Sequence, residues 1–432
     1  MLFAHIDILD EEFIYRSDRF VGIADGKVAY IGEKEPERDF GEVYDGRGKL
    51  LMPGLYNAHA HAPMTLLRGY AENKALDAWL NEQVFPFEAR IDAARTYPAT
   101  LLAIAEMLRF GVVSFSDMYY QTDARARAVE ESGIKANLCE GLIDFNDEDY
   151  RDTGFYELNE RLIREYHGAF DGRLKMDLCL HAEYTTTPLF VRTVADSARE
   201  HGVNMHVHLS ETRGEHEECK VRHEGRTPAA YFADLGVFDV PTTAAHCVWV
   251  EEGDLAIFAG KGVTVATNPV SNLKLGSGIM DEPAITKAGV RLALGTDGVA
   301  SNNNHNMWKD LFILSLLHKG VSCDPVGMDP RYALKVATRN GALSQSRPDC
   351  GLLAEGMCAD LIVIDTDVPW MAPVTQMERN LVYSAQGSDV VLTMVDGKVL
   401  YRDGEYLTVD VERAAFETQR DRDAIVSELQ GA

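Results

Sequence analysis

Hydrophobic residues in the middle of the chain fall into short runs that recur from about residue 55 to 350. The runs include "GVVSFSDM", "KANLCEGL", "LKMDLCLHA", "VNMHVHLSE", "TTAAHCVWV", "GVTVATNP" and "VRLALGTDG". Amphipathic stretches such as "ATLLAIAEMLRFG" separate most of them and are typical of helices. Apolar strands that alternate with helices indicate a parallel sheet covered on both faces. About eight such units predict a (β/α)8 barrel, with a doubly wound sheet as the alternative.

The two ends of the chain show a different pattern, in which hydrophobic and polar residues alternate. Near the N-terminus, "FVGIADGKVAYIGE" contains the hairpin signal Asp25-Gly26. Near the C-terminus, "ADLIVIDTD" predicts a buried strand, and "VVLTMVDGKVLYRDGEYL" predicts two strands joined at Asp396-Gly397. Because the two ends resemble each other, we expect them to form one small β-sandwich domain, residues 1–53 plus 351–432. Residues 54–350 would form the barrel.

The charge of the chain indicates which partners to expect, and its cysteines indicate the compartment. The chain carries 42 Lys and Arg against 68 Asp and Glu, a net charge of −26. Such a surface repels nucleic acid and anionic membranes, so we expect neither as a partner. No apolar run approaches the roughly 18 residues of a membrane helix. The seven cysteines contain no C-x-x-C, which favours reduced thiols in a cytoplasmic protein.

Polar side chains follow most of the predicted strands. In a (β/α)8 barrel the carboxyl ends of the strands meet at one mouth, so side chains far apart in the sequence would converge there. In chain order these residues are His59, His61, Asp117, Glu140, His181, His208, Glu211, His246, Asn268 and Asp297.

Histidines dominate this set and predict a metal site. His59 and His61 occupy positions i and i+2 of a strand and therefore face the same side. His208 ends "MHVHL", His246 ends "TTAAH" and Asp297 follows "LALGT". Three imidazoles and one carboxylate suit zinc or another divalent first-row metal. The structural alternative for His-x-His is a pair of surface or core histidines.

Two further residues bear on the chemistry of such a site. His206 shares a strand face with His208 and is an alternative ligand, although His208 lies nearer the end of the strand. A metal with an open position lowers the pKa of a bound water towards about 7. Glu211 follows closely and could carry protons for that water. The structural alternative for Glu211 is the first turn of a helix capped by Ser210.

Five stretches together resemble the amidohydrolase superfamily, and within it the branch that deaminates 5′-modified adenosines. They are "PGLYNAHAHAPMTLLRGYAENKALDAWL", "HVHLSET", "AAHCVWV", "NPVSNLKLGSGI" and "LGTDGVASNNNHNMW", and they span residues 53 to 308. The resemblance implies hydrolysis of 5′-deoxyadenosine, 5′-methylthioadenosine, adenosine or S-adenosylhomocysteine to the inosine analogue and ammonia. It also implies a homo-oligomer, a dimer or a tetramer.

The resemblance assigns roles to the strand-end residues. Glu211 would protonate the purine ring nitrogen, His246 would orient the hydroxide, and His246 and Asp297 would take its proton. One divalent ion is expected, zinc first, with iron, manganese or cobalt as alternatives. Its implied ligands are His59, His61, His208 and Asp297.

Four positions match or approximate substrate contacts of the family, in addition to Glu211. Glu88, in "VFPFEARI", matches a carboxylate that receives the ribose hydroxyls, and His181 matches a histidine lining the pocket. Trp79 would pack against the ligand, and Arg151 is the candidate for an arginine expected in a loop. The structural alternatives are a surface glutamate for Glu88 and a core tryptophan for Trp79.

The chain departs from the pattern of the family at three other positions. Glu140 stands where relatives that use S-adenosylhomocysteine have an arginine, which suits a carboxylate. Glu183 replaces a proline, and Trp249 stands in "AAHCVWV" where many relatives read "AAHCVHL". Two extra carboxylates would repel an anionic tail. We therefore expect substrates without the homocysteine tail.

Two alternatives remain at this stage. The first is another amidohydrolase that deaminates or dechlorinates a different heterocycle, such as guanine, a pterin or a triazine. The second is a non-catalytic barrel scaffold, whose signature would be lost metal ligands. Every matched ligand is present in this chain.

Overall fold

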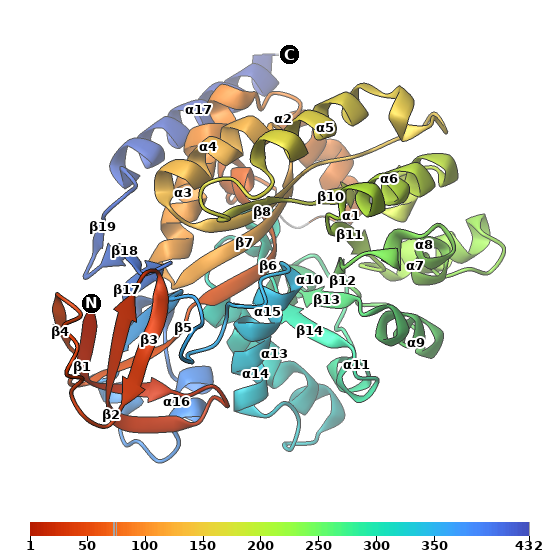
Figure 1. The fold of residues 1–432 in the computed structure, drawn as a ribbon. Coiled ribbons are helices and arrows are strands. Elements are labelled where there is room, and N and C mark those ends of the chain that lie inside the picture. Colours follow the sequence, from red (N-terminus) through yellow and green to blue (C-terminus); the bar gives the residue numbers. More distant parts are fainter. Residues whose placement is uncertain (72–73, 75, 432) are drawn as a thin grey trace.

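The structure is a computed structural model that describes residues 1–71, 74 and 76–431. It is an α/β fold in which parallel strands are surrounded by helices (Figure 1). Strands from both ends of the chain lie side by side at one edge of this α/β part, red beside blue in Figure 1. The α/β class and the parallel sheets predicted from the sequence are therefore confirmed.

The described residues of the middle of the chain form two parallel sheets of five strands each. The first has the order β15 (Asp297–Gly298), β6 (Leu55–His61), β7 (Val112–Tyr119), β8 (Lys135–Glu140) and β9 (Leu174–Met176). The second has the order β10 (Leu178–Leu180), β11 (Met205–Leu209), β12 (Thr242–His246), β13 (Thr264–Thr267) and β14 (Arg291–Leu294). The strands are buried almost throughout, which explains their continuous apolar runs.

The two parallel sheets are neighbours at both of their edges. Asp177 alone separates β9 from β10, and its N–H donates to the carbonyl of Leu138 on β8 at 2.9 Å. Two residues separate β14 from β15, and the second of them, Thr296, donates to the carbonyl of His59 at 3.2 Å. Apart from β15, which pairs with β6, the neighbour order within each sheet follows the chain, without the reversal of a doubly wound sheet.

Helices follow most of these strands and cover the sheets. Among the described residues none is long and apolar enough to cross a membrane. In chain order they are α1 (Leu76–Trp79), α2 (Phe85–Glu88), α3 (Ala93–Arg109), α4 (Thr122–Ser132), α5 (Gly154–Tyr166), α6 (Pro188–His201), α7 (Arg213–Arg222), α8 (Pro228–Asp234), α9 (Glu252–Lys261), α10 (Pro269–Lys274), α11 (Glu282–Lys287), α12 (Val299–Asn302), α13 (Met307–Ser322), α14 (Pro330–Ala337), α15 (Arg339–Ser344), α16 (Met377–Tyr383) and α17 (Val411–Gly431).

The terminal strands form one mixed sheet of nine strands among the described residues. The two ends meet where β5 pairs antiparallel with β16, with Pro53 opposite Leu361. Asp25-Gly26 and Asp396-Gly397 form the predicted hairpin turns, and all four residues have positive φ. The sheet runs β19 (Glu405–Tyr406), β18 (Lys398–Arg402), β17 (Val390–Val395), β16 (Leu361–Asp365), β5 (Lys49–Pro53), β1 (Leu2–Leu9), β2 (Tyr15–Ala24), β3 (Lys27–Gly32), with β4 (Val43–Asp45) against β1.

The last helix leaves this sheet and packs along α3, as Figure 1 shows. Ile425 of α17 is fully buried, and Glu428 Oε1 accepts a hydrogen bond from Arg95 Nη2 of α3 at 2.7 Å. The C-terminal segment therefore covers a helix of the α/β part as well as contributing strands to the terminal sheet.

A buried ion pair joins the terminal sheet to the parallel strands. Lys135 of β8 donates from Nζ to both oxygens of Asp360, at 2.8 and 2.6 Å, and Tyr56 of β6 donates to Asp360 Oδ2 at 2.5 Å. All three side chains are buried. The contacts with Lys135 and Tyr56 keep the pKa of the Asp360 carboxyl low despite its burial.

We predict that Lys135→Met lowers the free energy of unfolding by about 3–5 kcal/mol, because it leaves the Asp360 charge buried without its cation. Urea denaturation followed by circular dichroism measures the change. The control is Lys261→Met, whose ammonium pairs with Asp239 at 2.7 Å with both side chains partly exposed, and we expect a loss below about 1 kcal/mol there. Equal losses in the two variants would contradict the prediction.

Candidate metal centre and active site

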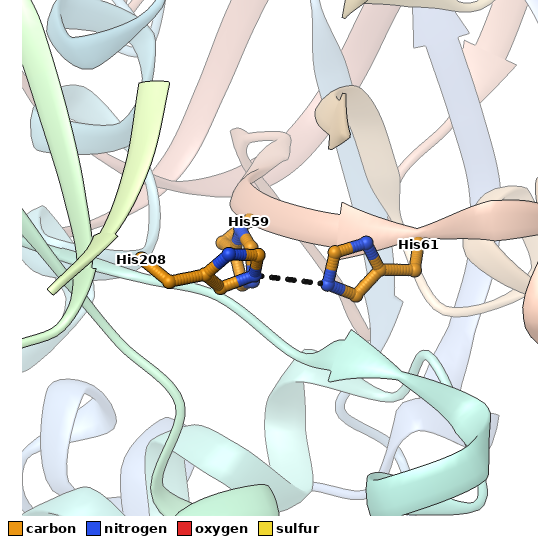
Figure 2. A group of neighbouring side chains, drawn as sticks. All are labelled: His59, His61 and His208. Atoms are coloured by element: carbon orange, nitrogen blue, oxygen red, sulfur yellow. Dashed lines mark hydrogen bonds between the residues drawn. The ribbon is translucent and has the colours of Figure 1, made fainter. Parts of the chain in front are cut away.

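The strand ends of both parallel sheets bring the predicted metal ligands together. His59 and His61 close β6, His208 lies near the end of β11, and Asp297 begins β15. Figure 2 shows the rings of His59, His61 and His208 gathered at one point. Their ligand atoms lie within 4.8 Å of one another, and a second overlapping group contains His59, His246 and Asp297.

The distances within the centre match donors that share one ion. Asp297 Oδ1 lies 3.4 Å from His59 Nε2 and 3.2 Å from His61 Nε2. His61 Nε2 also lies 3.3 Å from His208 Nε2. Ligand atoms about 2.0–2.1 Å from a tetrahedral zinc are roughly 3.3–3.4 Å apart. Among the described residues His59 Nε2 finds no hydrogen-bond partner although it is buried, so the residues fit a divalent first-row metal.

Each histidine of the trio is oriented through its other ring nitrogen. His61 Nδ1 donates to the carbonyl of Met118 at 2.5 Å, and His208 Nδ1 donates to that of His181 at 2.6 Å. A proton on Nδ1 leaves the lone pair on Nε2, which faces the centre. His59 Nδ1 lies 2.9 Å from His206 Nε2. His206 therefore stands behind His59 as its hydrogen-bond partner, while His208 takes the position proposed for a ligand.

Asp297 is held from its other oxygen. Oδ2 accepts hydrogen bonds from the hydroxyls of Ser271 at 2.6 Å and Ser301 at 3.0 Å, which leaves Oδ1 for the histidines. Burial by itself would raise the pKa of the Asp297 carboxyl, but the contacts with His59 and His61 hold it well below its usual value. Its φ of +62° is rare for a residue with a side chain and is typical of functional sites.

His246 and Glu211 face each other beside the centre. His246 Nδ1 lies 2.8 Å from Asn272 Oδ1, and its Nε2 lies 3.8 Å from Glu211 Oε2. Ser277 donates to the other oxygen of Glu211 at 3.1 Å. Burial raises the pKa of the Glu211 carboxyl above its usual value. A buried acid with a raised pKa suits proton transfer near neutral pH.

The helix that follows Glu211 begins later than the structural alternative supposed. Thr212, rather than Ser210, caps α7, and its hydroxyl accepts from the N–H of Glu215 at 3.1 Å. Glu215 in turn accepts from the N–H groups of Ser210 and Glu211, at 2.8 and 2.7 Å. The helix cap therefore uses Thr212 and Glu215, and the side chain of Glu211 is free to line the cavity.

A cavity of about 730 Å³, including solvent at its mouth, opens onto the centre. Four of the predicted substrate contacts line it, namely Trp79, Glu88, His181 and Glu211. Burial raises the pKa of the Glu88 carboxyl to about 7. Trp79 is buried except for the face it presents to the cavity, so it is both a core residue and a wall of the site.

Arg151, the fifth predicted contact, lies elsewhere. It belongs to a short 3-10 helix, Tyr150–Asp152, and does not line the cavity. Its guanidinium donates to Glu200 on α6 at 2.8 Å, near the surface. The structure therefore gives no contact between Arg151 and a ligand bound in the cavity.

The two extra carboxylates also lie outside the cavity lining, contrary to our expectation. Glu140 accepts from the backbone N–H and the hydroxyl of Thr122, at 3.0 and 2.6 Å, at the start of α4. Glu183 is held by Arg222, whose Nη2 donates at 2.6 Å, and by His223 Nε2 at 2.6 Å. Both charges are engaged by protein groups, so neither is placed to repel a substrate tail.

Trp249 also lies outside the cavity lining but touches the support of Glu211. Its indole N–H donates to the carbonyl of Ser277 at 2.7 Å, and the hydroxyl of Ser277 donates to Glu211. The departure from the family pattern at Trp249 thus affects how the loop behind Glu211 is held.

Sequence reasoning missed the groups that hold the centre in place. Arg125 is fully buried, and its Nη1 donates to Asp117 Oδ2 at 2.9 Å. Asp117 Oδ1 accepts from the N–H of Ala62 at 2.5 Å, directly after His61. The strand-end position of Asp117 was visible in the sequence, but its partner Arg125 sits on a helix and carries no local signal. Ser271 and Asn272 lie in "NPVSNLKLGSGI", where only their polar character marked them.

Comparisons with known proteins show the family to which the chain is similar. The sequence model of the Amidohydrolase family matches residues 50–400. The chain is 40% identical to 5′-deoxyadenosine deaminase of Methanosarcina mazei, over 95% of this chain and 94% of that protein. It is 42% identical to 5-methylthioadenosine/S-adenosylhomocysteine deaminase of Dictyoglomus thermophilum, over 88% of each. A crystal structure of an adenosine deaminase from Xanthomonas campestris with bound zinc superposes with a TM-score of 0.91 at 28% identity, covering 99% of this chain and 98% of that one.

We predict that zinc raises the melting temperature of the metal-free chain, because an ion that binds only the folded state stabilises it. At a free concentration of 100 times Kd the gain is about 2.7 kcal/mol. Calorimetry of chelator-treated protein with and without zinc measures it. Asp297→Asn should lose most of the shift, whereas Asp234→Asn, at an exposed ion pair with Arg226, should keep it. A full shift in Asp297→Asn would contradict the assignment.

Proposed function

The chain belongs to the amidohydrolase family, and we propose that it is a metal-dependent hydrolytic deaminase of 5′-modified adenosines. The reaction adds water to the substrate and releases the inosine analogue and ammonia. One observation carries the proposal: a buried carboxylic acid, Glu211, lies 3.8 Å from His246 beside a centre of three histidines and one aspartate. An acid beside a metal centre is needed when a poor leaving group such as an amine must be protonated.

The proposed fold behind this site is a closed (β/α)8 barrel with a small β-sandwich. The backbone contacts at both edges of the two parallel sheets support closure, with Asp177 bridging one edge and Thr296 the other. The pairing of β5 with β16 supports a domain built from both termini. In such barrels the active site lies at the carboxyl ends of the strands, where the cavity lies here.

The proposed cofactor is one divalent ion, with zinc as the first candidate. His59, His61, His208 and Asp297 would hold it, since their donor atoms converge and His59 Nε2 has no hydrogen-bond partner in the described part of the chain. When bound, the ion supplies the Lewis acidity that makes water nucleophilic near neutral pH. The zinc in the related structure from Xanthomonas campestris supports this choice.

The proton transfers are assigned to three side chains. Glu211, whose pKa burial raises, gives a proton to the purine ring nitrogen next to the amino-bearing carbon. Water attacks that carbon, and Asp297 and His246 take up its proton. His246 can accept on Nε2 because its Nδ1 donates to Asn272. The proton then passes to the amino group, the carbon–nitrogen bond breaks and ammonia leaves, while the proton of the remaining hydroxyl returns to Glu211 as the carbonyl forms.

The cavity supports a nucleoside better than a bare heterocycle. Glu88 stands on α2 and lines the same cavity as the centre, where its carboxylate would accept the ribose hydroxyls. Aromatic side chains such as Trp79 and Tyr119 form much of the wall. Among the residues that the structure describes in this lining, none is a lysine or an arginine. The 5′ substituent that fits such a wall is uncharged, which favours 5′-deoxyadenosine, 5′-methylthioadenosine and adenosine.

We predict that Glu211→Gln lowers kcat for 5′-deoxyadenosine by about 10²–10⁴-fold, the usual contribution of a general acid–base group. The ultraviolet change from adenine to hypoxanthine follows the reaction, and metal analysis should find the same zinc content as in the wild type. Glu217→Gln, an exposed carboxylate on α7, is the control and should keep full activity. Unchanged turnover in Glu211→Gln would refute the assigned acid.

The second prediction concerns the 5′ substituent. We expect kcat/KM for at least one substrate with an uncharged 5′ group to exceed that for S-adenosylhomocysteine by at least about tenfold, because an unpaired carboxylate forgoes a hydrogen bond worth about 1.5–3 kcal/mol. The panel contains 5′-deoxyadenosine, 5′-methylthioadenosine and adenosine, with guanine and a pterin as controls. A highest kcat/KM for S-adenosylhomocysteine would show that a cation reaches its tail.

A further inference from the structure

A second cluster of metal-ligating side chains lies in the segment between α15 and β16. The Cys350 thiol is buried, the Cys358 thiol is half-buried, and Asp349 is exposed. Each thiol donates to a different oxygen of Asp349, at 3.6 Å from Cys350 and 3.3 Å from Cys358. None of the three lines the active-site cavity. We propose that Asp349, Cys350 and Cys358 form a second metal site, for zinc or another thiophilic divalent ion.

The spacing of the three donor atoms fits one tetrahedral ion. Zinc lies about 2.3 Å from thiolate sulfur and about 2.0–2.2 Å from carboxylate oxygen, so neighbouring ligands are roughly 3.5–3.8 Å apart. The two sulfur–oxygen distances here, 3.6 and 3.3 Å, involve different oxygens of Asp349, and one carboxylate oxygen and the two sulfurs lie within 4.8 Å of one another. Binding would therefore need small side-chain shifts, with water in the fourth position.

The backbone already holds the two cysteines together. The N–H of Cys358 donates to the carbonyl of Asp349 at 2.8 Å and closes the loop between them. Arg339 Nη1 donates to the carbonyl of Cys350 at 2.6 Å. Gly351 has a φ of +78°, and a Cβ there would lie 2.8 Å from the Cα of Arg339. An ion that binds a preformed loop does not have to order it, which favours affinity.

Charged groups of both signs surround the cluster. Lys135 Nζ lies 3.8 Å from Cys350 Sγ, but it is engaged by Asp360 and Asp396, each at 2.6 Å. Lys175 also interacts electrostatically with Cys350 and with the Asp349 carboxylate. The cluster is therefore close to charge balance while both thiols keep their protons. Loss of the thiol protons on binding would leave a negative excess that a divalent cation offsets.

Cadmium or cobalt binding tests the site, because thiolate ligands give an ultraviolet charge-transfer absorption that histidine and carboxylate ligands do not. We expect the reduced wild-type enzyme, titrated past the first equivalent of ion, to develop this absorption with saturation at one further equivalent. Cys350→Ser and Cys358→Ser should lose it. Asp349→Asn, at an exposed position that poses little risk to folding, should weaken binding by at least about tenfold.

The control is Cys323→Ser, which removes an exposed cysteine outside the cluster and should leave the absorption unchanged. The deaminase assay should give wild-type rates for Cys358→Ser, so the result does not depend on the catalytic proposal. The proposal is overturned if the reduced wild type shows no thiolate absorption, or if the absorption survives in Cys358→Ser or vanishes in Cys323→Ser.

Discussion

The burial of several imidazoles around one carboxylate is the constraint on which the rest of the site depends. Burial lowers the pKa of His59 to about 3 and that of His208 well below its usual value. His61 differs, because its contact with Asp297 overcomes the effect of burial and raises its pKa to about 9. The metal-free chain therefore keeps most of these rings neutral, with lone pairs available to a cation.

Neutral rings can bind a cation only if their lone pairs point to one position, and groups on the far side of each ring fix this orientation. The carbonyls of Met118 and His181 and the ring of His206 each contact one nitrogen of a histidine that we propose as a ligand. The buried pair of Arg125 and Asp117 fixes the chain directly after His61. These supports come from different strands and helices, so the centre depends on the whole α/β part of the molecule. A defect in one support would change ligand orientation without removing any ligand.

Contacts from separate parts of the chain also position Glu211 at the cavity. Thr212 and Glu215 provide the hydrogen bonds at the start of α7, which leaves the side chain of Glu211 to line the cavity. On the opposite side, the hydroxyl of Ser277 donates to Glu211, and the indole N–H of Trp249 donates to the carbonyl of Ser277. By contrast, Glu140 accepts hydrogen bonds at the start of α4, and Glu183 forms an ion pair with Arg222. Carboxylates that look alike in the sequence thus differ in function according to whether a backbone N–H or a cation already binds them.

The sequence by itself determined the features that follow from short-range geometry. The i and i+2 spacing of His59 and His61, the strand-end positions of His208, His246 and Asp297, and the Asp-Gly hairpins all follow from the period of a strand and the demands of a tight turn. Tertiary structure alone decided that His206 supports His59, and that Arg151 turns to Glu200 instead of the cavity. It also decided that Arg125 completes the site. The direction of a side chain depends on partners distant in the sequence, and local periodicity carries no information about them.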